Sequence, residues 1–296
     1  MRAGVLRATA HEAAGAGQRV AGLRVVDRSA KQLARLGHEI VVASDGACPT
    51  PPGARVEPVA DGAEADALAA KLGAPVVAAD VVRPSNRDLD GGLRVTNGAS
   101  RGAAEDAVFA ELLRGDLGFV ARHFNKPLSF RFTRHVLCKL PITPNQVTVG
   151  AGLVGAGGAA LIASGRPWLM LVGFLLAHLQ SVLDGCDGEL ARVRFQQSAI
   201  GEWLDTVVDD ALNVLLFAAV GVGLWRETGS QTALVLGLAA AGTMVLYSTV
   251  AYRELVRQGQ GGEVLKVRWW FSRGGSLKER YGQERGFSPA RLLLTI

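Results

Sequence analysis

Cysteine and charge are scarce in this chain, and each scarcity excludes a class of protein. The 296 residues include three cysteines, Cys48, Cys138 and Cys186, whose odd number and wide spacing form neither a disulfide framework nor a zinc site. Charged residues make up only 20% of the chain and hydrophobic residues 49%, which favours a partly membrane-embedded protein over a soluble one. The sequence has no basic stripe with interleaved aromatic residues, so we expect no nucleic-acid partner.

The first half of the chain also lacks long charge-free stretches, which occur only after about residue 145. The first 20 residues lack the apolar core of a signal peptide, so this half is predicted to remain in the cytoplasm. Residues 1–115 hold 14 basic and 14 acidic residues, whereas residues 116–296 hold 18 and 13, so the net charge of +5 lies in the second half. A basic excess beside apolar segments indicates contact with lipid headgroups.

Residues 1–115 are predicted to form a small cytoplasmic α/β domain with a parallel sheet. Strand-like runs cover residues 3–8, 38–45 and 74–82, and a helical pattern covers 23–37 between the first two. Residues 85–103 are rich in Gly, Asn, Ser and Asp, which is typical of a loop, and a helix is expected from residue 104 to 115.

Residues 116–145 are predicted to be a linker that contains an amphipathic helix over 127–140. The apolar side chains of Leu128, Phe132 and Val136 fall on one face of this helix, and three basic side chains lie elsewhere. This pattern is typical of a helix that lies on an anionic membrane surface. An ordinary surface helix is the alternative.

Residues 146–296 are predicted to form an α-helical polytopic membrane bundle. Four apolar stretches, 146–164, 167–184, 199–224 and 231–252, are each close to the ~20 residues that a bilayer requires. Basic residues gather before the first span, between the second and third spans, and from 253 to 291. This distribution predicts that these segments and the N-terminal domain lie on the cytoplasmic side of the cell membrane. Residues 288–296 are similar to the start of a fifth span, so we expect the chain to be a fragment.

An acidic constellation lies where the second and third spans meet. Asp184 and Asp187 are three residues apart, and Asp205 and Asp209 are four apart, so each pair shares one face of a helix. A short connection makes the two helices antiparallel neighbours, and the two pairs can therefore converge. Charges are costly inside a membrane, so divalent cations are the natural compensation. Carboxylates alone suit Mg²⁺, Mn²⁺ or Ca²⁺, and two such ions suit the transfer of a phosphoryl group.

The complete pattern D-x2-D-G-x2-A-R-x8-G-x3-D-x3-D runs from Asp184 to Asp209 and resembles the signature of the CDP-alcohol phosphotransferase family. The resemblance implies a membrane enzyme that uses Mg²⁺ or Mn²⁺, with two ions at the site. A CDP-alcohol donor would transfer its substituted phosphate group to a second alcohol, such as an inositol phosphate or a lipid alcohol, and CMP would leave. Membrane lipids and a second copy of the chain, as a homodimer, complete the expected partners.

The resemblance also assigns roles by position. Asp184, Asp187, Asp205 and Asp209 would bind the metal ions, and Asp209 would also be the base that accepts the proton of the incoming hydroxyl. The nucleotide would contact a second set of residues: Gly185, Gly188, Ala191, Arg192, Gly201, Asn145 and Thr148. Asn145 and Thr148 belong to the segment ITPNQVT, and for these two helix capping is the alternative role. Asp210 is expected to be a bystander, and Cys186 is expected to be there only because it is small.

The N-terminal domain carries a second resemblance. Its strand–helix–strand order is similar to the opening of sugar-phosphate nucleotidyltransferases, in which the strand over 74–82 would end on a metal-binding acid, here Asp80. The combination resembles the fusion of inositol-phosphate cytidylyltransferase with di-inositol-phosphate-phosphate synthase. The glycine-rich phosphate loop that should follow the first strand is missing, so the domain is predicted to be a degenerate scaffold or regulator.

Two other functions stay open at this point. The N-terminal domain could be an active cytidylyltransferase that makes the CDP-alcohol, which would make the protein bifunctional. Alternatively, the aspartates could pass divalent cations across the membrane, but a carrier would have no need of Arg192.

Overall fold

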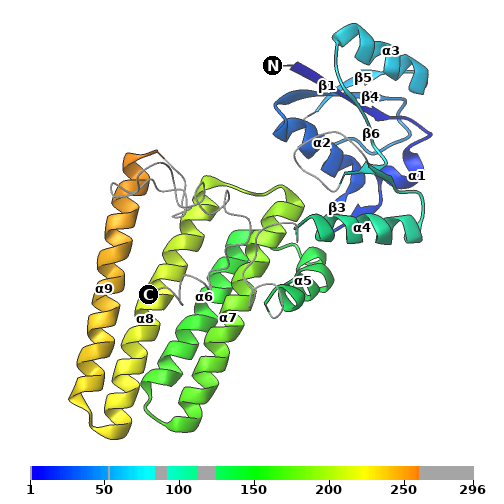
Figure 1. The fold of residues 1–296 in the computed structure, drawn as a ribbon. Helices are drawn as coiled ribbons and strands as arrows, with labels where there is room; N and C mark the ends of the chain where they lie inside the picture. Colours follow the sequence, from blue (N-terminus) through cyan, green and yellow to red (C-terminus); the bar gives the residue numbers. More distant parts are fainter. Residues whose placement is uncertain (1, 53, 84–91, 113–124, 260–296) are drawn as a thin grey trace, which may run out of the picture. The chain divides into compact units, whose positions relative to one another are not determined.

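The computed structural model describes residues 2–52, 54–83, 92–112 and 125–259 (Figure 1). The chain divides into two compact units. One comprises residues 1–116 together with 134–140 and 192–195, and it contains the α/β domain. The other comprises residues 117–133, 141–191 and 196–296, and it contains most of the long helices.

The α/β domain is built on a four-stranded parallel sheet, as predicted. The strand order is β5-β4-β1-β6, where Val5 of β1 pairs with Val41 of β4 on one side and Val76 of β6 on the other. The bounds of these strands are β1 (Arg2–Ala8), β4 (His38–Ser44), β5 (Arg55–Pro58) and β6 (Val76–Ala78).

Helices cover both faces of this sheet. Successive side chains of a strand point to opposite faces, so Leu6 packs in the cluster that includes Leu33 of α2 (Val25–Arg35), whereas Val5 packs in the cluster that includes Ala69 of α3 (Gly62–Leu72). The four-residue helix α1 (Ala13–Ala16) directly follows β1. The sheet therefore has two buried faces, and its carboxyl edge is left as the place where polar side chains gather.

Three predictions for this domain are wrong in detail. The predicted strand over 74–82 is two strands, because β6 ends at Ala78 and β7 (Val81–Val82) pairs with β8 (Leu93–Arg94) in a separate ribbon. The helix expected over 23–37 starts at Val25, after β3 (Leu23–Arg24), which pairs with β2 (Arg19–Val20). Part of the predicted 85–103 loop is helical: α4 (Gly98–Leu112) begins there because Asn97 Oδ1 accepts a hydrogen bond from the Ser100 backbone amide at 2.9 Å.

The second unit contains four helices that are long and apolar enough to cross a membrane, which confirms the predicted membrane bundle. They are α6 (Pro144–Ala163), α7 (Pro167–Arg194), α8 (Ala199–Thr228) and α9 (Gln231–Arg257). The last three continue beyond the predicted ends of their spans, and α7 runs past both of its signature aspartates. Residues 288–296, where a fifth span was predicted to start, lie outside the described residues.

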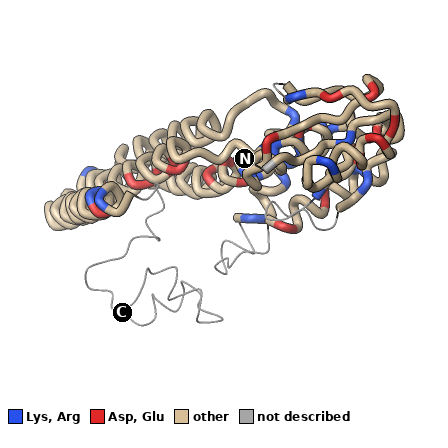
Figure 2. Tube along the Cα trace, turned by 90° about the horizontal axis from the view of Figure 1, so that it is seen from above, with Lys and Arg blue, Asp and Glu red and all other residues tan. Residues whose placement is uncertain are grey.

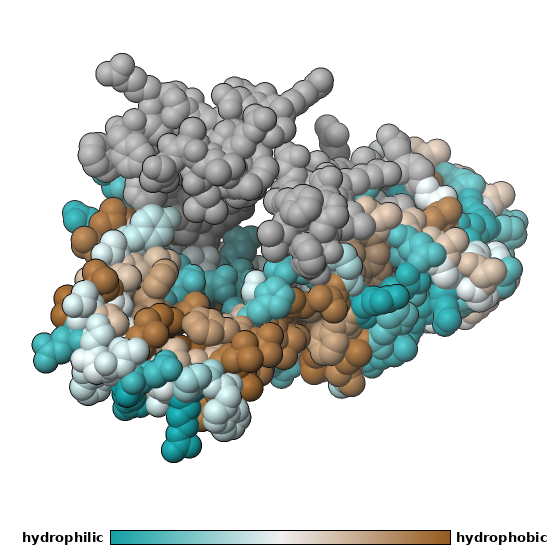
Figure 3. Space-filling view, turned by 60° about the horizontal axis from the view of Figure 1, so that its bottom comes forward, coloured by the Kyte–Doolittle hydropathy of each residue, from teal (hydrophilic) through white to brown (hydrophobic). Residues whose placement is uncertain are grey.

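The surfaces of these helices are those of lipid-facing segments. Charged residues are sparse along them (Figure 2), and apolar residues cover much of their visible side (Figure 3). Leu153, Leu171 and Leu236 are 71%, 63% and 65% exposed, although leucine is normally buried in soluble proteins. Such exposure is stable when lipid takes the place of water.

Small residues bring the helices close together. A Cβ added at Gly158 of α6 would lie 2.8 Å from the Gly173 carbonyl oxygen of α7, and one added at Gly237 of α9 would lie 2.5 Å from Gly221 Cα of α8. Close backbone approach at glycine is a common way for helices to pack inside a membrane.

A shorter helix precedes the bundle. α5 (Lys126–His135) ends before the predicted end at residue 140, and a 3₁₀ turn (Leu137–Lys139) follows it. The apolar side chains of Leu128 and Phe132 are exposed, as an interfacial helix requires. The position of α5 at a membrane surface stays a prediction.

Candidate active site

The connection between α7 and α8 makes the two helices antiparallel neighbours. Phe195 has a φ of +55°, which turns the chain out of α7, and the Gln196 backbone amide donates back to the Ala191 carbonyl oxygen at 2.8 Å. Ser198 then caps α8, since its Oγ accepts a hydrogen bond from the Gly201 backbone amide at 3.0 Å. The reversal is short, and it brings the end of α7 beside the start of α8.

This reversal brings carboxylates from both helices together. Asp184 and Asp187 of α7 and Asp205 of α8 each offer one oxygen, and the three oxygens lie within 4.8 Å of one another. The Oδ1 atom of Asp205 is buried and has no hydrogen-bond partner among the described residues. An orphaned carboxylate oxygen in an all-oxygen cluster fits a hard divalent cation such as Mg²⁺ or Mn²⁺.

Asp187 is held in place by neighbours. The buried hydroxyl of Thr148 on α6 donates a short hydrogen bond to Asp187 Oδ2, and the Gly188 backbone amide donates one to Oδ1. The capping alternative for Thr148 is wrong, because Thr143 and Gln146 form the capping box at the start of α6. Thr148 is therefore a partner of a predicted metal ligand.

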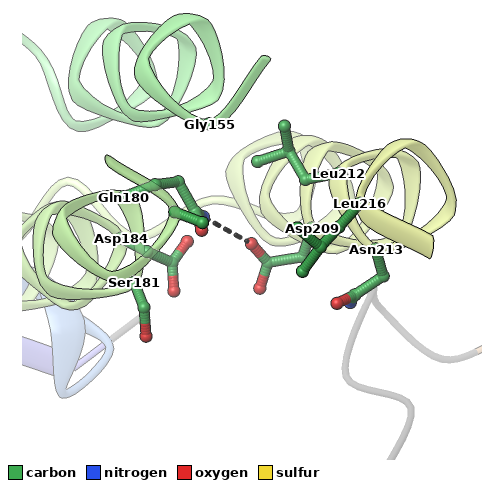
Figure 4. Close-up of a pocket in the computed structure, with 9 residues that line it drawn as sticks. Gly155, Gln180, Ser181, Asp184, Asp209, Leu212, Asn213 and Leu216 are labelled. Atoms are coloured by element: carbon green, nitrogen blue, oxygen red, sulfur yellow. Dashed lines mark hydrogen bonds between the residues drawn. The ribbon is translucent and has the colours of Figure 1, made fainter. Parts of the chain in front are cut away.

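The fourth signature aspartate, Asp209, lies outside that group of three and lines a cavity together with Asp184 (Figure 4). The cavity has a volume of about 320 Å³. Gln180 Nε2 donates a hydrogen bond to Asp209 Oδ1 at 3.3 Å. The walls come from α6, α7 and α8, and the lining residues are Gly155, Ala177, Gln180, Ser181, Asp184, Asp209, Leu212, Asn213 and Leu216.

Sequence reasoning missed the polar wall of this cavity. Gln180 stands one turn before Asp184 on α7, and Asn213 stands one turn after Asp209 on α8, so both continue the faces that carry the aspartates. That spacing was the available signal. The two helices thus present amide groups as well as carboxylates.

The predicted nucleotide contacts fall into different environments. A Cβ added at Gly201 would lie 3.1 Å from Asn145 Oδ1, so this glycine permits a close approach of α6. A Cβ added at Gly185 would lie 3.7 Å from Lys126 Nζ and from Ser129, so Gly185 faces α5. Ala191 is partly buried, and Arg192 is exposed.

Asp210, the predicted bystander, and Cys186 both have partners in the structure. Asp210 accepts a hydrogen bond from the Tyr252 hydroxyl of α9 at 2.7 Å. Cys186 is fully buried, and its Sγ donates to the Val182 carbonyl oxygen at 3.3 Å. Asp210 therefore ties α8 to α9.

A second group of polar residues lies at the carboxyl edge of the α/β sheet. Glu12 is 1% exposed, and its Oε2 accepts from the Thr9 backbone amide at 3.0 Å, while Asp45 Oδ2 accepts from the Ala10 amide at 2.6 Å. Burial opposes ionisation of Glu12, but the hydrogen bonds from Thr9 and the charge of Arg7 prevail and lower its pKa.

Asp80 follows β6 at the same edge of the sheet. Its carboxylate is 2% exposed and forms an ion pair with Arg94 at 3.3 Å, and its Oδ1 has no hydrogen-bond partner among the described residues. Burial raises the pKa of Asp80, and the charge of Arg94 offsets only part of that effect.

Comparison with known proteins defines the class. Residues 141–274 match the family model described as CDP-alcohol phosphatidyltransferase. This match covers α6 to α9 and contains the whole signature. Through this region the chain belongs to the CDP-alcohol phosphatidyltransferase family. With its four apolar helices, it is a multi-pass membrane protein.

Particular relatives resemble the same region. The bifunctional IPC transferase and DIPP synthase of Thermococcus kodakarensis is 36% identical over 46% of this chain and 30% of its own length, and that of Aquifex aeolicus is 34% identical over 46% and 30%. The archaetidylinositol phosphate synthase of Methanothermobacter thermautotrophicus is 27% identical over 41% of this chain and 59% of its own length. The chain thus spans less than a third of the first two relatives.

Proposed function

We propose that the membrane region transfers a substituted phosphate group from a CDP-alcohol to the hydroxyl of a second alcohol and releases CMP. The observation that carries the proposal is the convergence of Asp184, Asp187 and Asp205 within one signature. These three, with Asp209, would hold divalent cations, Mg²⁺ or Mn²⁺. When bound, the cations neutralise the charge of the diphosphate.

The residues of the chain divide the remaining work. Asp209 accepts the proton of the acceptor hydroxyl while the oxygen of that hydroxyl forms a bond to the β-phosphorus of the donor. The bond between that phosphorus and the bridging oxygen breaks, and the electron pair leaves with CMP. Gln180 holds one oxygen of Asp209 by its hydrogen bond, and the cavity that both residues line can hold an alcohol beside the base.

The nucleotide is proposed to lie toward the start of α6 and the junction of α7 with α8. Gly188, Ala191 and Gly201 leave little side-chain bulk there, Asn145 offers an amide oxygen beside Gly201, and Arg192 offers a planar fork for phosphate. Gly185 contributes less, because it faces α5.

The acceptor class is proposed to be an inositol phosphate, with a lipid alcohol as the second choice. One of the relatives named above is an archaetidylinositol phosphate synthase, whose name contains an inositol phosphate. We propose that the enzyme lies in the cell membrane with its active site and α/β domain on the cytoplasmic side. We also propose that it is a homodimer.

The test uses the purified full chain in phospholipid vesicles with Mg²⁺. It is given CDP-inositol or CDP-diacylglycerol with inositol phosphate, and mass spectrometry follows CMP and the phosphodiester product. Asp209→Asn should abolish CMP release but keep most of the Mn²⁺ binding. Asp210→Asn is the matched control, since an amide oxygen can still accept from Tyr252. Absence of CMP with every donor would overturn the proposal, and cation flux into vesicles of the parent protein that Asp209→Asn abolishes would favour a carrier.

We further propose that the α/β domain is a degenerate nucleotidyltransferase-like domain that does not bind a nucleoside triphosphate. The amides after β1 would have to bind phosphate, but those of Thr9 and Ala10 already donate to Glu12 and Asp45. Carboxylates at these positions also repel an anion. Full-length protein with CTP, Mg²⁺ and inositol phosphate should release no pyrophosphate; release would instead support a bifunctional enzyme.

A further inference from the structure

Glu189 is a fully buried carboxylate inside the signature of the family, at a position that the pattern leaves variable. Its side chain is 0% exposed. Oε1 accepts hydrogen bonds from Lys126 Nζ at 2.9 Å and Ser129 Oγ at 2.6 Å, and Oε2 accepts one from Thr133 Oγ1 at 2.8 Å. A buried charge is stable only with such partners, so this set acts as one unit.

All three donors come from one face of α5. Lys126, Ser129 and Thr133 are spaced by three and four residues, which places them along one side of a helix. Ser129 and Thr133 are buried, whereas Leu128 and Phe132 are 57% and 38% exposed. The helix therefore turns its polar face toward α7 and its apolar side chains outward, which suits contact with lipid.

α5 covers the side of α7 that faces away from the metal-binding carboxylates. With 3.6 residues per turn, Glu189 lies about 140° around α7 from Asp184. Gly185 and Cys186 face α5 as well: a Cβ on Gly185 would lie 3.7 Å from Ser129, and Cys186 Sγ lies 3.6 Å from the Ser129 carbonyl oxygen. The contact thus extends along the stretch of α7 that carries Asp187 and Gly188.

We infer that Glu189 is a positioning residue that clamps α5 onto α7 and thereby fixes the rotation of α7 at its signature. The rotation decides whether Asp187 meets Thr148 and Asp205 or turns away from them. The inference rests on the proposed function only for the reaction that the positioned residues serve. The clamp itself stands on the buried contacts.

The experiment uses full-length protein with Cys48→Ala and Cys138→Ala, so that Cys186 is the single thiol. Lys126→Met leaves the Glu189 charge buried without its cation, and Lys126→Met/Glu189→Gln removes the stranded charge. We expect the first variant to raise the rate of maleimide labelling at Cys186 by about tenfold and to weaken Mn²⁺ binding by about tenfold, and the double variant to recover most of both. Arg131→Met removes a cation from the exposed side of α5 and should change neither.

A milder pair covers the case in which Lys126→Met does not fold. Thr133→Val removes one donor at nearly constant volume, and Thr133→Ser keeps it, so only the valine variant should show faster labelling and weaker Mn²⁺ binding. Unchanged labelling in both Lys126→Met and Thr133→Val would overturn the clamp. Faster labelling with unchanged Mn²⁺ affinity would overturn the positioning role and leave a structural contact. Both readouts need no CDP-alcohol, so an inactive parent protein would count against the proposed function alone.

Discussion

Gln180 on α7 donates a hydrogen bond from its amide nitrogen to Oδ1 of Asp209 on α8 (Figure 4), with 3.3 Å between the two atoms. An amide nitrogen cannot accept a proton in return, so this contact orients the carboxylate and leaves its other oxygen for another partner. Both side chains line the cavity that contains Asp184. Asp209, the base in the proposed reaction, is therefore oriented by Gln180 of the neighbouring helix.

Replacement of Gln180 tests this relationship. Gln180→Met keeps the length of the side chain but removes the donor, and we expect kcat for CMP release to fall by about tenfold with a smaller change in KM, because hydrogen bonds to charged groups contribute about 1.5–3 kcal/mol. Gln180→Glu places a second negative charge beside Asp209, and kcat for CMP release should fall further. A methionine variant as active as the parent would contradict the prediction.

Thr148 is the second test of support around the aspartates. Thr148→Val removes the hydroxyl that donates to Asp187 at almost the same volume. Loss of an outer partner typically weakens metal affinity by about 10–100-fold, so Mn²⁺ titration followed by electron paramagnetic resonance should show a drop of about tenfold or more. Thr148→Ser retains the donor and serves as the control. Equal affinities for the two variants would count against the prediction.

The contact between α8 and α9 predicts a loss of stability. Gly237→Ala would place a methyl group 2.5 Å from Gly221 Cα, so one helix has to move. Overpacking of this kind costs about 1–3 kcal/mol, which thermal unfolding in detergent micelles would detect. Gly242 lies on the same helix with nothing within 4 Å of its added Cβ, so Gly242→Ala should unfold like the parent.

The α/β domain predicts a dependence of its stability on pH. The folded state lowers the pKa of Glu12, so its contribution to stability is present above the unfolded pKa of about 4.3 and is lost as the pH falls through the folded value. Hydrogen exchange of β1 and β4, measured by mass spectrometry, should show less protection at acid pH. Glu12→Gln should flatten this response.

Asp80 has the opposite sign and provides the internal comparison. Burial raises the pKa of Asp80, so the folded domain favours the protonated carboxyl. The domain therefore loses stability as the pH rises from the unfolded pKa of Asp80 through its higher folded pKa. Asp80→Asn should therefore increase protection at neutral pH relative to acid pH. The same response in both variants would contradict the assignment.

Some elements could be predicted because their signals are local. The lengths of the four apolar runs predicted α6 to α9, and short strand-like runs on either side of a helical pattern predicted the strands that hold Val5 and Val41. The start of α4 was missed because the cap at Asn97 lies inside a stretch whose composition is typical of a loop. β6 and β7 were merged because nothing in the apolar run shows that its two ends pair with different strands.

The sequence by itself determined that Asp184 and Asp187 share one helical face, and Asp205 and Asp209 another, because the helical repeat follows from covalent geometry and backbone hydrogen bonding. It also determined that the two helices return past each other. Only the tertiary structure decided which of these carboxylates meet, that Thr148 and Gln180 contact them, and that Glu189 contacts α5 on the opposite side of α7. Those contacts depend on how far each helix is rotated and how closely it approaches its neighbour. That is set by packing between residues distant in the sequence, such as Gly158 with Gly173.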